Sequence, residues 1–168
     1  SVTHIPEGAF KWLQHVVEVD LPEGLIEIGD GAFTSCKSLA RINLPSTLLK
    51  IGRGAFQYAG LTDVRLPDGL VAIGPAAFME CKLLESIRIP SGVQIIPRNC
   101  FRNSRLRDVE LPEGVVEIQD LAFHYCGSLE SISIPSSVRL IRERAFCGCI
   151  KLTALVLPGG LEEIGEQA

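Results

Sequence analysis

The stretch CKSLARINLPSTLLKIGRGAF, residues 36–56, recurs along the chain and decides its fold. A close copy, CGSLESISIPSSVRLIRERAF, occupies residues 126–146. Each of the chain's seven phenylalanines belongs to one such unit, and their successive spacings are 23, 23, 22, 23, 22 and 23 residues. They are Phe10, Phe33, Phe56, Phe78, Phe101, Phe123 and Phe146. A fixed period of this length is typical of a repeat solenoid, in which each coil buries its apolar side against its neighbours.

Each unit has the pattern of a short strand, a turn and a second apolar segment. In residues 42–44, Ile-Asn-Leu, apolar side chains alternate with a polar one, which predicts a strand with one buried face. Pro45 ends this strand because it has no N–H to donate to a sheet. Leu48 and Ile51 then belong to the core again. The equivalent prolines are Pro22, Pro45, Pro67, Pro90, Pro112, Pro135 and Pro158.

Small residues accompany the phenylalanine in most units. A glycine follows the second apolar segment in four of them, where we expect a tight bend with a positive φ angle. These glycines are Gly29, Gly52, Gly74 and Gly165. Ala32 precedes Phe33, and this small residue lets the ring fill the space between coils. We therefore expect an internal column of rings, with the coils offset by about 4.8 Å.

Cysteine marks a turn three residues after the phenylalanine. It stands there in four units, as Cys36, Cys81, Cys126 and Cys149. Two other units have Ala59 and Ser104 instead, and one residue is missing before their next leucine. Cys126 and Cys149 are neighbours in the stack, but parallel inward side chains suit a disulfide poorly. We expect all six cysteines to be free thiols that act as small apolar residues.

These units resemble the BspA-type leucine-rich repeat, and the resemblance extends over essentially the whole chain. It implies a right-handed leucine-rich repeat solenoid of about seven coils of 22–23 residues, with a parallel β-sheet face and short strands or helical turns opposite. We expect residues 1–168 to form a single solenoid that is a fragment of a longer repeat array. The resemblance also implies a cell-surface or secreted protein that acts by binding, with no catalytic residues.

Composition and motifs exclude several classes of function. The hydrophobic fraction of 46% and the charged fraction of 21% are those of a folded protein. A net charge of −4 argues against a nucleic-acid-binding surface. No apolar run approaches the roughly 20 residues that a transmembrane segment needs. His4, His15 and His124 stand in no active-site signature, so we expect neither an enzyme nor a cofactor.

One close pair of cysteines, Cys147 and Cys149, raises the question of a metal. His124 occupies the same repeat position as Cys147 in the adjacent coil, so the two side chains are candidates for a shared site. The four-ligand spacing of a zinc site is absent. We therefore expect no metal and interpret Cys149 as the buried turn residue.

The outward positions of the predicted sheet carry the strongest functional signal, because strand alternation points them away from the core. The candidate partner-binding residues are Arg41, Asn43, Asp63, Arg65, Arg88, Asp108, Glu110 and the nearby Glu85. Arg65 and Arg88 are adjacent like charges, which disfavours the sheet modestly. Asp63, Glu85 and Glu110 are expected to neutralise them in part. This surface is either a solvated, internally paired face or a docking strip centred on Arg65 and Arg88.

Three aromatic residues share another repeat position, at a turn: Trp12, Tyr58 and Tyr125. Such residues are enriched at interfaces, but for Trp12 we favour a role in covering the end coil. The sequence as a whole predicts a non-catalytic protein-interaction or scaffold module that binds another protein through its sheet face. Two alternatives remain open: an adhesin or ligand-binding segment of a surface protein, and a structural subunit of a large assembly.

Overall fold

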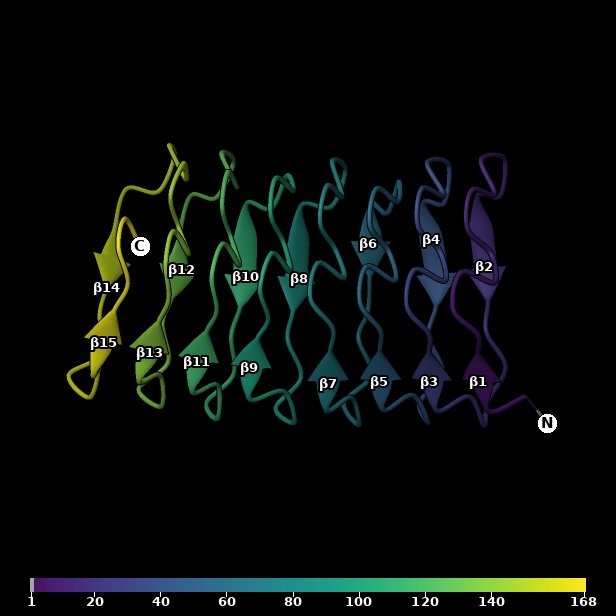
Figure 1. Ribbon diagram of the computed structural model, residues 1–168, viewed down its shortest axis with the longest axis horizontal. Helices are drawn as coiled ribbons and strands as arrows, with labels where there is room; N and C mark the ends of the chain where they lie inside the picture. The colour runs from purple at the N-terminus through teal and green to yellow at the C-terminus, as the bar shows by residue number, and fades with distance from the viewer. Residues whose placement is uncertain (1) are drawn as a thin grey trace.

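The computed structural model describes residues 2–168 and shows a stack of coils made of short strands and turns (Figure 1). Within these residues there is no helix, and the chain makes about seven turns, one for each repeat. Its two termini lie at opposite ends of the stack (Figure 1). All strand pairs in the stack are parallel, so the predicted repeat solenoid is confirmed.

One row of strands comes from the segment before each proline. It consists of β2 (Glu18–Asp20), β4 (Arg41–Asn43), β6 (Asp63–Val64), β8 (Ser86–Arg88), β10 (Asp108–Glu110), β12 (Ile132–Ser133) and β14 (Leu155–Val156). In β4, β8 and β10 the middle residue is buried and its two neighbours are exposed, as strand alternation requires. We call the outer surface of this even-numbered row the sheet face.

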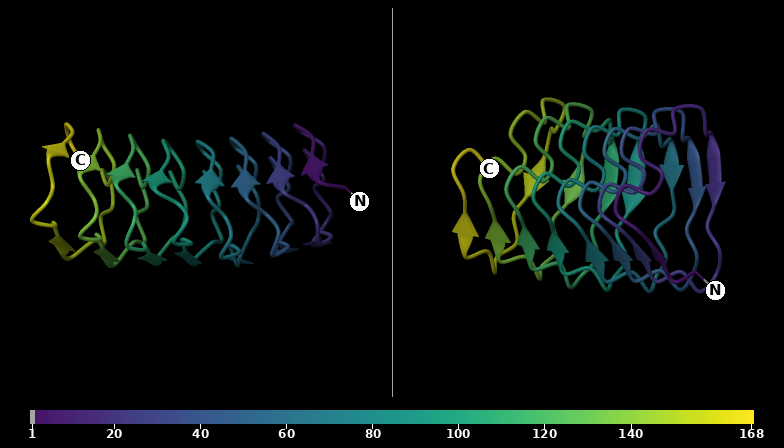
Figure 2. Two further views of the ribbon diagram at one scale, coloured as in Figure 1. Left: turned by 90° about the horizontal axis from the view of Figure 1, so that it is seen from below. Right: turned by 45° about the vertical axis from the view of Figure 1, so that its right-hand side comes forward.

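A second row of two-residue strands comes from the apolar segment after the proline. It consists of β1 (His4–Ile5), β3 (Glu27–Ile28), β5 (Lys50–Ile51), β7 (Ala72–Ile73), β9 (Ile95–Ile96), β11 (Glu117–Ile118), β13 (Leu140–Ile141) and β15 (Glu163–Ile164). Figure 2 shows the two rows on separate sides of the stack. Of the two predicted arrangements for this side, short strands or helical turns, the chain forms short strands.

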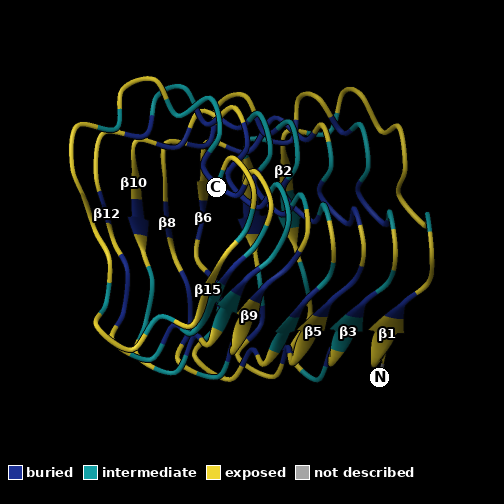
Figure 3. Cartoon of the chain, turned by 60° about the vertical axis from the view of Figure 1, so that its left-hand side comes forward, coloured by how far each residue is buried: buried dark blue, intermediate teal, exposed yellow. Residues whose placement is uncertain are grey.

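The phenylalanines form the predicted internal column. Successive rings stack with centroids 5.3–5.7 Å apart and interplanar angles of 2–24°. The rings from Phe33 to Phe123 are at most 2% exposed, whereas Phe10 at the N-terminal end is 39% exposed. Figure 3 shows buried segments that recur in successive coils. The column is thus the shared core that each coil provides for its neighbour.

The reason for the repeated glycine differs from the predicted one. Gly52 and Gly74 do not have a positive φ; instead, a Cβ atom would lie 2.7 Å from the backbone nitrogen of Asp30 at Gly52 and 2.4 Å from that of Arg53 at Gly74. Close approach of the preceding coil therefore excludes a side chain. Positive φ occurs at two other repeat positions, two residues before and two residues after each phenylalanine. The residues at the first position are Gly8, Gly31, Gly54, Ala76, Asn99, Leu121, Arg144 and, before Ala168, Gln167.

The cysteines are free throughout the described part of the chain, as predicted. The four thiols that stand three residues after a phenylalanine are also hydrogen-bond donors, which the sequence did not indicate. The Sγ atom of Cys81 donates to the carbonyl oxygen of Phe56 in the preceding coil at 3.2 Å. Cys36, Cys126 and Cys149 make the same contact with Phe10, Phe101 and Phe123. This repeat position therefore ties one turn to the next as well as filling space.

Candidate docking site on the sheet face

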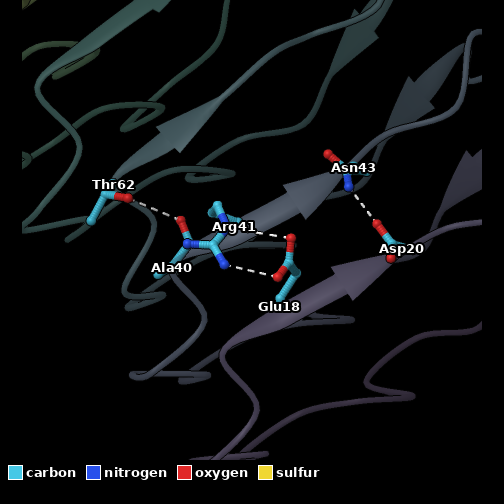
Figure 4. Close-up of polar contacts among 6 residues, drawn as sticks. All are labelled: Glu18, Asp20, Ala40, Arg41, Asn43 and Thr62. Carbon is cyan, nitrogen blue, oxygen red and sulfur yellow. Dashed lines mark hydrogen bonds and ion pairs between the residues drawn. The ribbon is translucent and has the colours of Figure 1, made fainter.

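The N-terminal part of the sheet face is internally paired (Figure 4). The guanidinium of Arg41 donates to the Glu18 carboxylate, with an Nη2–Oε2 distance of 2.8 Å, and this contact lowers the pKa of Glu18. The amide of Asn43 donates to the Asp20 carboxylate one coil away. Because Arg41 and Asn43 already have partners on β2, their side chains are held along the sheet face.

A groove opens further along the same face, between β6 and β8. It has a volume of about 300 Å³ and an apolar floor of Val64, Leu66 and Ile87. Its polar walls are Asp63, Arg65, Asp68, Ser86, Arg88, Asp108 and Glu110. Five of the eight predicted site residues therefore meet here: Asp63, Arg65, Arg88, Asp108 and Glu110. The other three, Arg41, Asn43 and Glu85, do not line the groove.

The charges in the groove are only loosely satisfied. Arg88 lies between Glu110, with an Nε–Oε2 distance of 3.6 Å, and Asp68, with an Nη1–Oδ1 distance of 3.9 Å. Its side chain is 72% exposed, and such solvated pairs contribute about 0.2–1 kcal/mol each. Within residues 2–168, Arg65 makes no ion pair with any carboxylate. The groove thus presents two guanidinium groups whose ties to the protein are weak or absent.

The predicted neutralisation of the two arginines is only partly correct. Glu110 contacts Arg88, as expected. Glu85 instead faces the next coil and pairs with Arg105 at 3.5 Å. Asp63 is in register with Arg41, but Arg41 points to Glu18. Which partner each side chain pairs with depends on its rotamer and on the distance to its neighbours. An alignment of repeats gives neither.

The sequence prediction missed two polar walls of the groove: Ser86 on β8 and, in the turn after β6, Asp68. Asp68 directly follows Pro67 and is 94% exposed. A signal was present, because Asp68 stands at the repeat position of Glu23 and Glu113, whose carboxylates bind the next coil. The shorter aspartate makes no such contact in the described residues, so it is left facing solvent beside Arg88.

The aromatic turn residues lie outside this groove. Trp12 is 62% exposed, Tyr125 57% and Tyr58 43%. The Trp12 ring has the Lys11 ammonium 5.8 Å from its centroid, and the role predicted for Trp12, covering the end coil, stays a prediction. The apolar hollow at that end, of about 390 Å³, is lined by others, among them Phe10 and Phe33.

The histidine considered for a metal site is buried. His124 is 8% exposed, and burial lowers its pKa, helped by the charges of Arg102 and Arg144. The turn carrying Cys147 is in register, because the N–H of Tyr125 donates to the Cys147 carbonyl oxygen at 2.8 Å. Across residues 2–168, no group of three or more potential metal-ligating side chains comes together.

Known proteins contain the same type of repeat. A family model of the BspA-type leucine-rich repeat region, six copies long, matches residues 3–130 and 116–168. The chain belongs to this family. No curated protein matches this leucine-rich repeat chain. Among the described residues, none form a helix long and apolar enough to cross a bilayer.

Solved structures of bacterial leucine-rich repeat proteins share the fold. One from Bacteroides ovatus is 34% identical with a TM-score of 0.90, covering 95% of this chain and 42% of that one. One from T. pallidum is 32% identical with a TM-score of 0.88, covering 99% of this chain and 80% of that one. A leucine-rich cell surface protein from Faecalibacterium prausnitzii is 26% identical with a TM-score of 0.51, covering 91% and 62%. The chain thus spans less than half of the Bacteroides ovatus protein.

Proposed function

We propose that this leucine-rich repeat chain is a non-catalytic interaction module that binds another protein through the groove between β6 and β8. The observation that carries the proposal is that Arg65 forms no ion pair with a carboxylate in the described residues. Arg88, on the neighbouring strand, lines the same groove. At β2 and β4, by contrast, the equivalent outward side chains bind each other. The groove therefore offers a partner two guanidinium groups and four carboxylates, of which Arg65 is the guanidinium left free to pair with a carboxylate of the partner.

The groove favours a folded protein or a peptide over a small molecule. Its lining residues come from three coils, and it is a shallow surface feature with charges of both signs. The buried residues Val64, Ile87 and Val109 anchor the three strands in the core, so the side chains on either side of them point outward. An extended surface built from several coils is how repeat proteins bind their partners.

The experiment is a charge reversal with a matched control. The double variant Arg65→Glu, Arg88→Glu is compared with Arg53→Glu, which reverses an exposed arginine away from the sheet face. Both are used as baits for proteins from the native source, and thermal melting checks that they fold. We expect the groove variant to lose a partner that the wild type and the control retain. Equal recovery of the same partner by all three baits contradicts the proposal.

A second candidate is an adhesin segment at a cell surface. It is supported by the similarity to the Faecalibacterium prausnitzii protein, which is described as a leucine-rich cell surface protein. In this case the chain binds a glycan or a matrix protein as an isolated fragment. Arrays of glycans and matrix proteins distinguish the two candidates, because the charge-reversed variant retains a ligand that binds elsewhere on the coils.

A further inference from the structure

One junction between coils lacks backbone bonds that the others have. In the odd-numbered row, the residue after each strand donates its N–H to the isoleucine carbonyl of the preceding coil. The donors are Gly29, Gly52, Gly74, Gln119, Arg142 and Gly165, with N–O distances of 2.7–2.9 Å. Within residues 2–168 the series has a single gap, at Pro97, which has no N–H. The strands on either side, β7 and β9, accordingly belong to different sheets.

The even-numbered row is interrupted at the same junction. Thr62 donates its N–H to Ala40 at 3.1 Å, and Arg107 donates to Glu85 at 2.8 Å. The equivalent bond from Glu85 to Thr62 is absent from the described residues, and β6 and β8 are in different sheets. The break between β10 and β12 differs, because β11 and β13 remain paired on the other row. Only the junction at Pro97 is open on both rows of the described chain.

A side-chain tie is also missing there. Elsewhere the Glu23 carboxylate accepts hydrogen bonds from the backbone N–H and the hydroxyl of Ser46, at 3.2 and 3.0 Å. Glu113 and Ser136 repeat this pair at 3.1 Å for both bonds. At the open junction the corresponding residues are Asp68 and Ser91. Aspartate is one methylene shorter, and this pair makes no hydrogen bond in residues 2–168.

The turns that carry the phenylalanines remain joined across the junction. Ala76, Phe78 and Glu80 donate their N–H groups to carbonyls of the next coil, each at 2.9 Å. The Phe78 and Phe101 rings still stack, with a centroid distance of 5.7 Å against 5.3–5.4 Å for the other pairs. The two coils are therefore held along one edge. Figure 1 shows a wider space between β7 and β9 than between the other neighbours in that row.

We infer that this junction is a hinge: residues 2–83 and 84–168 are two blocks that rock about the turns of Phe78 and Phe101. Within residues 2–168 the backbone bonds that would resist opening of the two strand rows are missing at this junction, and the Arg88–Asp68 ion pair that crosses it is long, at 3.9 Å. The backbone bonds between the two phenylalanine turns are intact. Every other junction in residues 2–168 keeps a ladder on at least one of its two rows, so motion concentrates at this one place. The groove is lined from both blocks, by Arg65 on one and Arg88 on the other, so its width follows the hinge.

Distances between pairs of spin labels test the hinge in the whole chain. Labels carried by encoded unnatural amino acids leave the native thiols untouched. The first pair of labels is placed at Leu49 and Val116, which are exposed and lie beside strands of the odd-numbered row on opposite sides of the junction. Gln94 and Glu162 span the same number of coils within one block, and both are exposed. We expect a broader distance distribution for the first pair than for the second.

A repaired variant supplies the decisive comparison. Pro97→Gly restores the missing N–H, and Asp68→Glu restores the carboxylate that reaches the serine of the next coil. We expect the double variant to narrow the distribution of the Leu49–Val116 pair to the width of the control pair. Equal widths in the unrepaired chain, or a broad distribution that the repair leaves unchanged in a folded protein, overturn the hinge. These outcomes are independent of whether a partner binds the groove.

Discussion

Removal of one ring from the phenylalanine column, Phe78→Ala, tests the packing of the whole solenoid. The Phe78 side chain is 0% exposed, and its ring lies between those of Phe56 and Phe101, with centroids at 5.4 and 5.7 Å. Transfer of such a side chain from water contributes about 1.5–3 kcal/mol. The cavity left between two rigid coils adds to this loss, so we expect a total cost of about 3–5 kcal/mol.

Urea unfolding followed by circular dichroism measures this cost. Phe10→Ala is the matched control, because its ring is 39% exposed and stacks on one neighbour only. The control should cost well under half as much, since less apolar surface is lost and solvent already reaches the site. A cost below about 1 kcal/mol for Phe78→Ala, or one equal to that of the control, refutes the stacked core.

Three further changes follow from particular contacts. Cys81→Ala removes the hydrogen bond from the thiol to the Phe56 carbonyl and should lower the free energy of unfolding by about 1–2 kcal/mol. Cys147 is only half-buried, so Cys147→Ala should change this free energy by less than about 0.5 kcal/mol. Urea unfolding of both variants measures the difference. Burial raises the pKa of Cys81 from 9.0 to about 12, so the unfolded chain loses this proton first as the pH rises. The free energy of unfolding should therefore fall between pH 9 and 12, and less steeply in Cys81→Ala. Gly54→Ala, at φ 56°, should cost about 1 kcal/mol in thermal melts, and Ala76→Gly, at φ 57°, should be neutral or stabilising.

The architecture was predictable because its determinants repeat. The phenylalanine spacing alone places seven rings in one column, and the alternation in residues 42–44 places one buried side chain between two exposed ones. Seven coils average out the irregularities of any one of them. The same averaging concealed the role of Gly52, because a bend with positive φ and a close contact between backbones both select glycine.

The candidate site was predictable as a surface and not as a set of contacts. Strand alternation identifies Arg65 and Arg88 as outward residues, and the groove contains both. The choice of partner by Arg41 or Glu85 depends on differences of a few ångströms between flexible side chains. The open junction escaped prediction for another reason. Pro97 fits the backbone of its own coil. Its effect lies in the hydrogen bond to the preceding coil, which proline cannot donate and without which β7 and β9 are not paired.

The groove and the open junction coincide, and one cause accounts for both. A closed ladder between β6 and β8 would hold the two strands at the ordinary spacing of about 4.8 Å, with outward side chains packed as they are on β2 and β4. Where the ladder is missing, Val64 and Ile87 form a floor between walls, and within residues 2–168 Asp68 makes no hydrogen bond to Ser91 of the next coil. Arg88 is then shared between Asp68 and Glu110 at distances too long for strong pairing. Departures from the repeat therefore coincide with the candidate site, at the one junction of residues 2–168 where both strand rows are open.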